Sequence, residues 1–147
     1  MRYLFNIVFA ICTTSFSKTS YVKSDLSNET TPIKMKIIIG TAEFDATLYE
    51  SKTTEALKSF LPLTIRMNEL NGNEKYHYLL HPLPAKETAI GKIQTGDLML
   101  YGDNCLVLFY KTFTTTYTYT RIGRLNDTTG LAAALGNDKV TVTFEQK

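Results

Sequence analysis

The feature that most constrains the fold of this chain is a repeated pattern of short segments in which apolar and polar residues alternate. Residues 43–49 place Phe44, Ala46 and Leu48 on one face of an extended chain, and residues 139–145 repeat the pattern. Side chains of a strand alternate between the two faces of a sheet, so this period indicates half-buried strands. Threonine, which favours strands, accounts for 22 of the 147 residues. The sequence therefore predicts a mainly β protein.

Turn signals divide the chain into about eight strands that follow one another mostly as hairpins. The further expected strands are residues 36–39, 63–68, 75–80, 97–101, 105–111 and 117–122. Two segments have helical spacing instead: residues 51–61, with Ser51 or Thr53 as a cap, and a short segment from Leu131 to Leu135. Hairpins with two isolated helices favour a closed antiparallel β-barrel of about eight strands, its ends covered by two short capping helices.

One stretch between these elements has no strand pattern of its own. Pro82, Pro84 and Gly91 interrupt residues 82–96, and proline and glycine are typical of loops. We expect a connection of about fifteen residues here.

The amino terminus has the features of an export signal. In residues 1–17, Arg2 precedes a short apolar run, and the small residues Ser15 and Ser17 occupy the positions that a signal peptidase reads. We expect cleavage before Lys18 and a protein exported to the periplasm, cell surface or extracellular space. An N-terminal strand or buried helix is the alternative, since ten apolar residues are too few to cross a bilayer.

Cys12 offers a different interpretation of the same leader. In that case it becomes the lipid-modified first residue of a bacterial lipoprotein, and lipidation is the only membrane attachment that we expect. Residues 18–34 are rich in Ser, Thr, Lys and Asn and predict a flexible polar tether. The folded domain is then expected to comprise residues 35–147.

Charge and cysteine content exclude several classes of function. A formal net charge of +2 is far below what binding to a phosphate backbone usually needs, so we expect no nucleic-acid partner. Cys105 lies in an apolar run, where a free cysteine behaves as a small hydrophobic residue. His77 and His81 have helical metal-ligand spacing, but their context is a strand followed by Pro82. We expect neither a metal site nor another cofactor.

Several sequence motifs resemble those of the cyclophilin-like families of bacterial proteins, which have a cyclophilin-type barrel without being standard cyclophilins. These motifs occur in the expected order, over about residues 35 to 145: Gly96–Tyr101, Cys105–Tyr110, Tyr117–Arg124 and Gly130-Leu131. The resemblance implies the barrel fold, but it names no ligand, because fold does not imply function.

Standard cyclophilins are peptidyl-prolyl isomerases, and the resemblance therefore implies one enzyme hypothesis. Arg66 is the nearest counterpart of their central arginine, which donates a hydrogen bond to the prolyl nitrogen as the amide loses its resonance. The pocket for the proline ring would come from Met67, Phe109, Phe113 and Tyr117. Other cyclophilin positions lack counterparts, since the chain has no Trp.

The most suggestive binding surface is a stripe along residues 117–122. Tyr117, Tyr119 and Arg121 project on one side, and with Arg66 and Tyr110 alongside they would form an aromatic and cationic groove for a peptide or a small anionic ligand. In the alternative, the tyrosines pack on the barrel and Arg121 forms a surface ion pair. We therefore expect an exported binding domain, with a divergent prolyl isomerase and a protein-interaction module of the cell envelope as alternatives.

Overall fold

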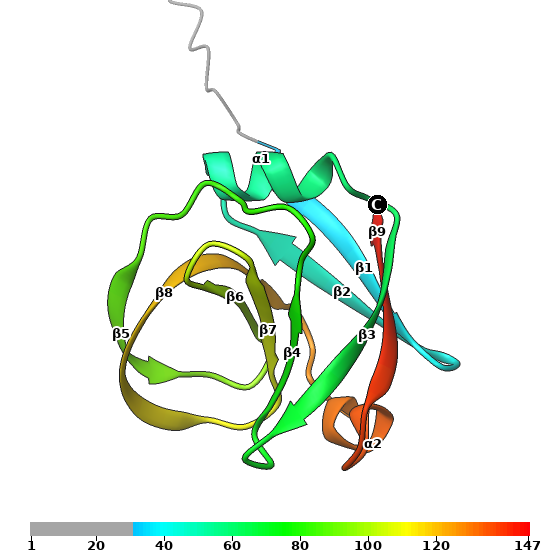
Figure 1. The fold of residues 1–147 in the computed structure, drawn as a ribbon. Helices are drawn as coiled ribbons and strands as arrows, with labels where there is room; N and C mark the ends of the chain where they lie inside the picture. The colour runs from blue at the N-terminus through cyan, green and yellow to red at the C-terminus, as the bar shows by residue number, and fades with distance from the viewer. Residues whose placement is uncertain (1–30) are drawn as a thin grey trace, which may run out of the picture.

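The computed structural model describes residues 31–147 (Figure 1). The predicted signal peptide, Cys12 and most of the predicted tether lie outside the described residues. The elements in chain order are β1 (Ile33–Ile39), β2 (Ala42–Leu48), α1 (Lys52–Lys58), β3 (Leu63–Leu70), β4 (Glu74–Tyr78), β5 (Thr88–Ile93), β6 (Asp97–Tyr101), β7 (Cys105–Phe109), β8 (Phe113–Leu125), α2 (Leu131–Leu135) and β9 (Val140–Gln146). Strand β1 thus begins two residues before the predicted start of the domain.

Eight of these strands form a closed antiparallel barrel, as predicted. The sheet has the order β2-β1-β9-β3-β4-β7-β6-β8-β5, and an additional pairing between β2 and β8 closes the ring. Closure depends on Gly123 of β8, because a Cβ atom there would lie 2.6 Å from the carbonyl oxygen of Thr47 on β2. A glycine at this position lets the two backbones approach each other closely.

The predicted connection over residues 82–96 contains a ninth strand, β5, which corrects that expectation. It pairs with the first half of β8, and its register shifts between Ala89 and Gly91. Gly91 has a φ of 71°, which glycine adopts readily, so the residue marks an irregularity within a strand and not a loop. Strand β8 is also longer than the predicted residues 117–122, since it begins at Phe113.

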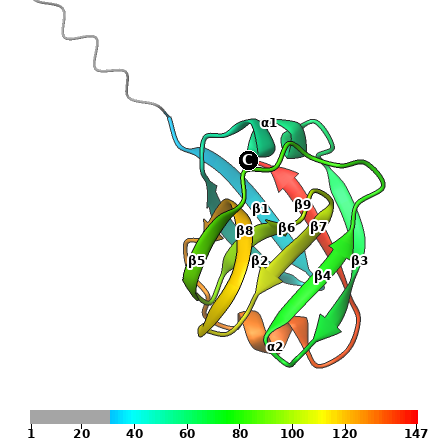
Figure 2. The same ribbon diagram turned by 60° about the vertical axis from the view of Figure 1, so that its left-hand side comes forward.

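The barrel interior is the main core, and the helices cover its two ends. Met35, Ile37, Val142 and Phe144 are among its fully buried residues. Ser51, one of the two predicted capping residues, caps α1 by accepting a hydrogen bond from the backbone N–H of Thr54. Leucines of both helices join the same core, and Figures 1 and 2 show α1 and α2 at opposite ends of the barrel.

A second, smaller core lies on the outside of the barrel. It contains Met99 of β6, Val107 and Phe109 of β7, Tyr119 of β8 and Ile93 of β5. Strand β7 is apolar on both faces for this reason: Leu106 and Leu108 face the barrel interior, whereas Cys105, Val107 and Phe109 face the second core. The β5–β8 pair therefore covers an outer face of the barrel that would otherwise be exposed (Figure 2).

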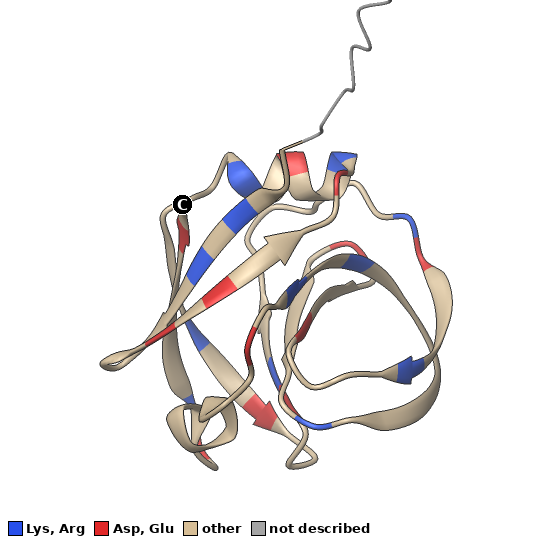
Figure 3. Cartoon of the chain, turned by 180° about the vertical axis from the view of Figure 1, so that it is seen from behind, with Lys and Arg blue, Asp and Glu red and all other residues tan. Residues whose placement is uncertain are grey.

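The opposite side of the barrel has charged residues of the two signs on neighbouring strands. Lys34 and Lys36 lie on β1, and Glu43 and Asp45 lie on the paired strand β2 (Figure 3). Lys36 Nζ lies 2.7 Å from a carboxylate oxygen of Glu43, and Lys147 Nζ lies 2.6 Å from one of Asp45. These exposed pairs contribute little stability, and they neutralise one another locally.

Candidate functional site

A pocket of about 650 Å³ opens beside the second core. It lies between the outer face of β4 and β7, the end of β6, and the first half of β8. Its size falls within the range of small-molecule sites in proteins. The lining residues are Leu70, Asn71, Asn73, Glu74, Tyr76, Tyr78, Tyr101, Cys105, Val107, Phe113, Thr114, Thr115, Thr116, Tyr117 and Tyr119.

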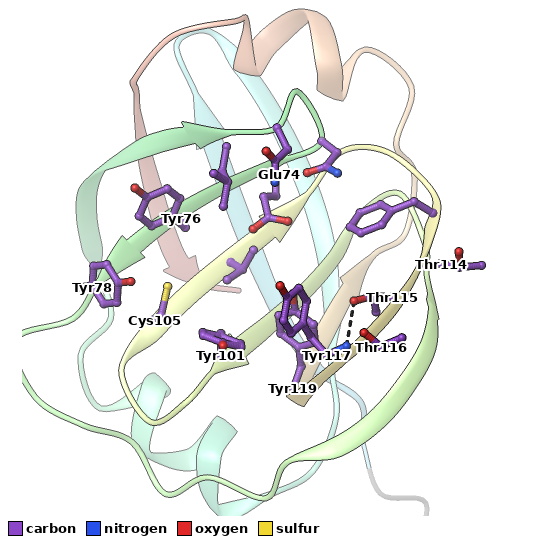
Figure 4. Close-up of a pocket in the computed structure, with 15 residues that line it drawn as sticks. Glu74, Tyr76, Tyr78, Tyr101, Cys105, Thr114, Thr115, Thr116, Tyr117 and Tyr119 are labelled. Carbon is purple, nitrogen blue, oxygen red and sulfur yellow. Dashed lines mark hydrogen bonds between the residues drawn. The ribbon is translucent and has the colours of Figure 1, made fainter.

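Strand β4 forms one wall of the pocket with the side chains of one of its faces. Glu74, Tyr76 and Tyr78 are two residues apart, so they project on the same face. Their partners across the β4–β7 ladder are Phe109, Val107 and Cys105 of the second core, which places this face outside the barrel. Figure 4 shows the Glu74 carboxyl directed into the pocket, with Tyr76 and Tyr78 on one side of it.

Glu74 is the chemically unusual residue of the pocket. Only 9% of its surface is exposed, and within residues 31–147 its carboxyl accepts no hydrogen bond and forms no ion pair. Burial, with a smaller contribution from the negative charge of Glu69, raises the pKa of Glu74 from its usual 4.5 to about 7. A buried acid with a raised pKa in a cleft is typical of functional sites.

The neighbouring cation, Lys75, does not neutralise Glu74, because it lies on the other face of β4. Lys75 is fully buried, and its Nζ lies 2.6 Å from Glu69 and donates to the carbonyl oxygen of Asp138, also at 2.6 Å. Burial alone would raise the pKa of Glu69, but hydrogen bonds from Lys75 and Tyr110 outweigh burial, and the pKa falls below its usual value. This network therefore leaves Glu74 without a partner among the described residues.

Aromatic rings form the opposite wall. The Tyr101 ring centroid lies 6.1 Å from that of Tyr117 and 5.5 Å from that of Tyr119, and Tyr119 in turn packs edge-on against Phe109 at 5.5 Å. Such tilted and edge-to-face pairs are favourable and hold the rings in place. Tyr119 is 5% exposed and Tyr117 62% exposed, so the wall extends from the buried base of the pocket to its rim.

Two further groups give the pocket polar character. The side-chain oxygen Oδ1 of Asn73 is buried without a hydrogen-bond partner within the described part of the chain. The Thr115 hydroxyl accepts a hydrogen bond of 3.1 Å from the backbone N–H of Tyr117 (Figure 4). A buried polar atom without a partner is costly, and in a pocket it indicates an atom that a ligand can satisfy.

Two further groups of the pocket, Cys105 and Tyr119, have raised pKa values. Burial, together with the Glu74 charge, raises the pKa of the Cys105 thiol to about 11 and that of the Tyr119 hydroxyl to about 12. A reactive thiol needs a lowered pKa. Cys105 is therefore a buried lining residue, as its sequence context predicts.

Three of the predicted site residues lie together at the pocket. Phe113, Tyr117 and Tyr119 line it, and Phe109 lies beneath Phe113 and Tyr119 in the second core. The alternation of residues along the predicted strand is the reason that Tyr117 and Tyr119 could be placed together in advance.

The other predicted site residues are not brought together. Met67 is buried in the barrel interior, and Tyr110 is also in that core, where its hydroxyl donates to Glu69. Arg66 on β3 is exposed, and Arg121 on β8 is exposed outside the set of pocket residues. In the closed ring, three strands separate β3 from β8 in either direction, so the two arginines cannot share one groove.

Sequence reasoning missed Glu74, Tyr76, Tyr78, Tyr101 and Asn73. One signal was present: Glu74 begins a strand in which the residues two and four positions later are tyrosines. The continuous apolar run of β7 was a second signal, because it indicates a strand that is covered on both faces.

Two other features of the described chain bear on site chemistry. Residues 31–147 contain no group of three or more His, Cys, Asp or Glu side chains that could hold a metal ion. In the same residues, no helix is both long and apolar enough to cross a membrane.

Comparison with known proteins agrees with this fold. No curated protein matches the chain. The solution structure of a hypothetical protein from Archaeoglobus fulgidus is similar, with a TM-score of 0.52 and 19% sequence identity over 79% of this chain and 95% of that one. At this identity the likeness concerns the fold alone. The sequence profile of the cyclophilin-like family matches residues 37–145, nearly the whole described domain. The chain therefore belongs to the cyclophilin-like family.

Proposed function

We propose that this domain is a binding module that holds a small organic molecule, or one side chain of a peptide, in the pocket between β4 and β8. The observation that carries this proposal is the composition of the pocket. Five tyrosines and a buried carboxyl, which has no partner among residues 31–147, line a volume of about 650 Å³. Ligand sites in proteins combine an apolar, aromatic lining with a few polar groups in this way.

The pocket does not favour the prolyl isomerase hypothesis. The residues that line it include no Lys or Arg, so the guanidinium donor that the hypothesis assigns to Arg66 is missing from the pocket. Arg66 lies elsewhere on β3, and Met67, its expected pocket partner, is enclosed in the barrel core. A binding function is therefore the better supported of the two.

Nuclear magnetic resonance tests the proposal with three probes that share one aromatic ring: 2-phenylethylamine, 2-phenylethanol and phenylacetate. Titration into the full domain should shift the backbone amide signals of β4 and of residues 113–119. Signals of β1 and β2 on the opposite side of the barrel should stay unchanged. If none of the three probes shifts the pocket signals, the proposed function is wrong.

A pair of matched variants assigns the binding to this pocket. Tyr76→Ala removes part of the β4 wall and should weaken binding of the best probe by about twofold to tenfold, the range for one aromatic contact. Tyr49→Ala removes an equally large, partly exposed ring outside the pocket and should leave the affinity unchanged. Equal losses in the two variants would place the binding elsewhere.

We also propose that the protein is exported, on the strength of the leader in residues 1–17. Fractionation of expressing cells, followed by amino-terminal sequencing, tests this. Processing before Lys18 supports a cleaved signal, and a lipid-modified Cys12 supports the lipoprotein alternative. Full-length protein confined to the cytoplasm contradicts both.

A further inference from the structure

We propose that the ligand is an organic cation that donates hydrogen bonds: a protonated amine on an apolar or aromatic body, with its nitrogen at Glu74 and its body between the two tyrosine walls. This inference rests on the proposed binding function and specifies its ligand class. The charge, the unsatisfied acceptors and the aromatic geometry of the pocket support it.

The charge of the pocket is unbalanced. Glu74 is the one acidic residue among those that line it, and no Lys or Arg accompanies it. The nearest basic residue in sequence, Lys75, is held on the other face of β4 by Glu69 and Asp138. An ionised Glu74 thus lacks a counter-ion in the part of the chain that the structure describes, and a buried charge is stable only when it is paired. A cationic ligand would supply the missing partner.

The unsatisfied acceptors specify the kind of cation. The Glu74 carboxyl accepts no hydrogen bond, and Asn73 Oδ1 is buried without a donor within residues 31–147. An ammonium group has three N–H donors that it can give to acceptors such as the Glu74 carboxylate, whereas a quaternary ammonium has none. Charge-assisted hydrogen bonds of this kind are also stronger than neutral ones.

The aromatic walls fit the remainder of such a molecule. Tyr76 and Tyr78 follow Glu74 along β4, and Tyr101, Tyr117 and Tyr119 lie together across the pocket from that strand (Figure 4). Tyrosine faces attract cations and also pack well against apolar bodies. The ligand can therefore place its charge at the base of the pocket and its body along the rings.

The pH dependence of binding follows from the groups that surround Glu74. These are Glu69 from the β3–β4 hairpin, Cys105 from β7, Tyr110 after it, Tyr101 from β6, and Tyr117 and Tyr119 from β8. Burial and nearby negative charges raise the pKa values of Cys105, Tyr110 and Tyr119 to about 11 or 12, and that of Glu69 is lowered, so none of these four titrates near pH 7.

Isothermal titration calorimetry with 2-phenylethylamine, 2-phenylethanol and phenylacetate tests the inference. The amine stays protonated near pH 7, as a lysine side chain does. We expect the amine to bind most tightly and phenylacetate most weakly. With the Glu74 pKa near 7, its ionised fraction rises from about one tenth at about pH 6 to about nine tenths at about pH 8, and affinity for the amine should rise about fivefold to tenfold. Affinity for the alcohol should stay constant.

Two variants make the same charge change at different places. Glu74→Gln should remove both the preference for the amine and its pH dependence, while 2-phenylethanol still binds. Glu55→Gln, on the exposed face of α1, should change neither. Circular dichroism and the binding of 2-phenylethanol would show that the Glu74→Gln variant is folded with its pocket intact.

The outcomes separate this inference from the proposed function. If the alcohol or the acid binds as tightly as the amine, the cation inference is wrong and the pocket remains a binding site. If no probe binds, the proposed function fails as well. An acetylated Gly-Lys-Gly amide peptide distinguishes the sources of the amine: tighter binding than 2-phenylethylamine points to a lysine side chain, and weaker binding to a free amine.

Discussion

Replacing Glu74 with Gln should stabilise the empty protein at alkaline pH. The substitution keeps the shape of the side chain and removes a charge that has no partner within residues 31–147. Each tenfold change in a protonation constant is worth about 1.4 kcal/mol, so a carboxyl whose pKa rises from 4.5 to about 7 destabilises the folded state by about 3 kcal/mol once it is ionised. Because solvent reaches the pocket mouth, we expect about half of this, about 1.5 kcal/mol.

The direction of the pH dependence follows from proton binding. Between about pH 4.5 and about pH 7 the folded state holds the Glu74 proton more tightly than the unfolded state does, so this residue makes stability fall as pH rises through that window. The loss is complete above about pH 8. The Gln variant lacks this contribution, and the two proteins should therefore be similarly stable near pH 4.5 and diverge above it.

Urea denaturation of both proteins at about pH 5 and about pH 8 measures the effect, with the free energy of unfolding obtained by linear extrapolation. The gain in stability of the variant over the wild type should be much larger at the higher pH. A variant that is less stable at about pH 8 would mean that the carboxylate has a favourable partner in the fold. An equal difference at both pH values would mean that its pKa is not raised.

Three further predictions follow from other parts of the fold. Gly123→Ala should destabilise the barrel by about 2 kcal/mol in urea denaturation, because the new Cβ would meet the Thr47 carbonyl oxygen at 2.6 Å. Unchanged stability would contradict the close approach of β2 and β8. Tyr110→Phe removes a hydroxyl that lies 2.9 Å from both carboxylate oxygens of Glu69, and it should lower the free energy of unfolding by about 1.5 kcal/mol. An unchanged free energy of unfolding would show that this hydrogen bond contributes nothing to stability. Cys105 should react with a thiol reagent at about pH 8 far more slowly in the folded than in the urea-unfolded protein, because burial raises its pKa to about 11. Equal rates in the two states would show that the Cys105 thiol is not buried.

The local pattern of the sequence was sufficient to predict most of the strands of the barrel. Strands such as β2 and β9 have one apolar and one polar face, and their alternation identifies both the element and the side that enters the core. The helices were also predictable, because the period changes at Ser51 and glycine follows Leu135. Strand β5 was not, since its residues have no clear alternation and it is a strand because it pairs with β8.

The candidate site was much harder to predict from the sequence than the strands were, because it is formed by distant segments. Periodicity placed Tyr117 and Tyr119 on one face, but it could not show that this face folds back over β7 and lies opposite Tyr76. Nor could it show that ring closure puts Arg66 and Arg121 on opposite sides of the barrel.

The sequence by itself determined which residues form strands and which faces of them are apolar, since these depend on neighbours along the chain. Only the tertiary structure decided what covers each face, because that depends on pairings between distant segments. Glu74 is the clearest case. Its neighbour in sequence is a lysine, yet the fold places Lys75 on the other face of the strand and leaves the carboxyl without a partner in the described domain. Burial and the absence of a partner together make this residue the chemical centre of the pocket.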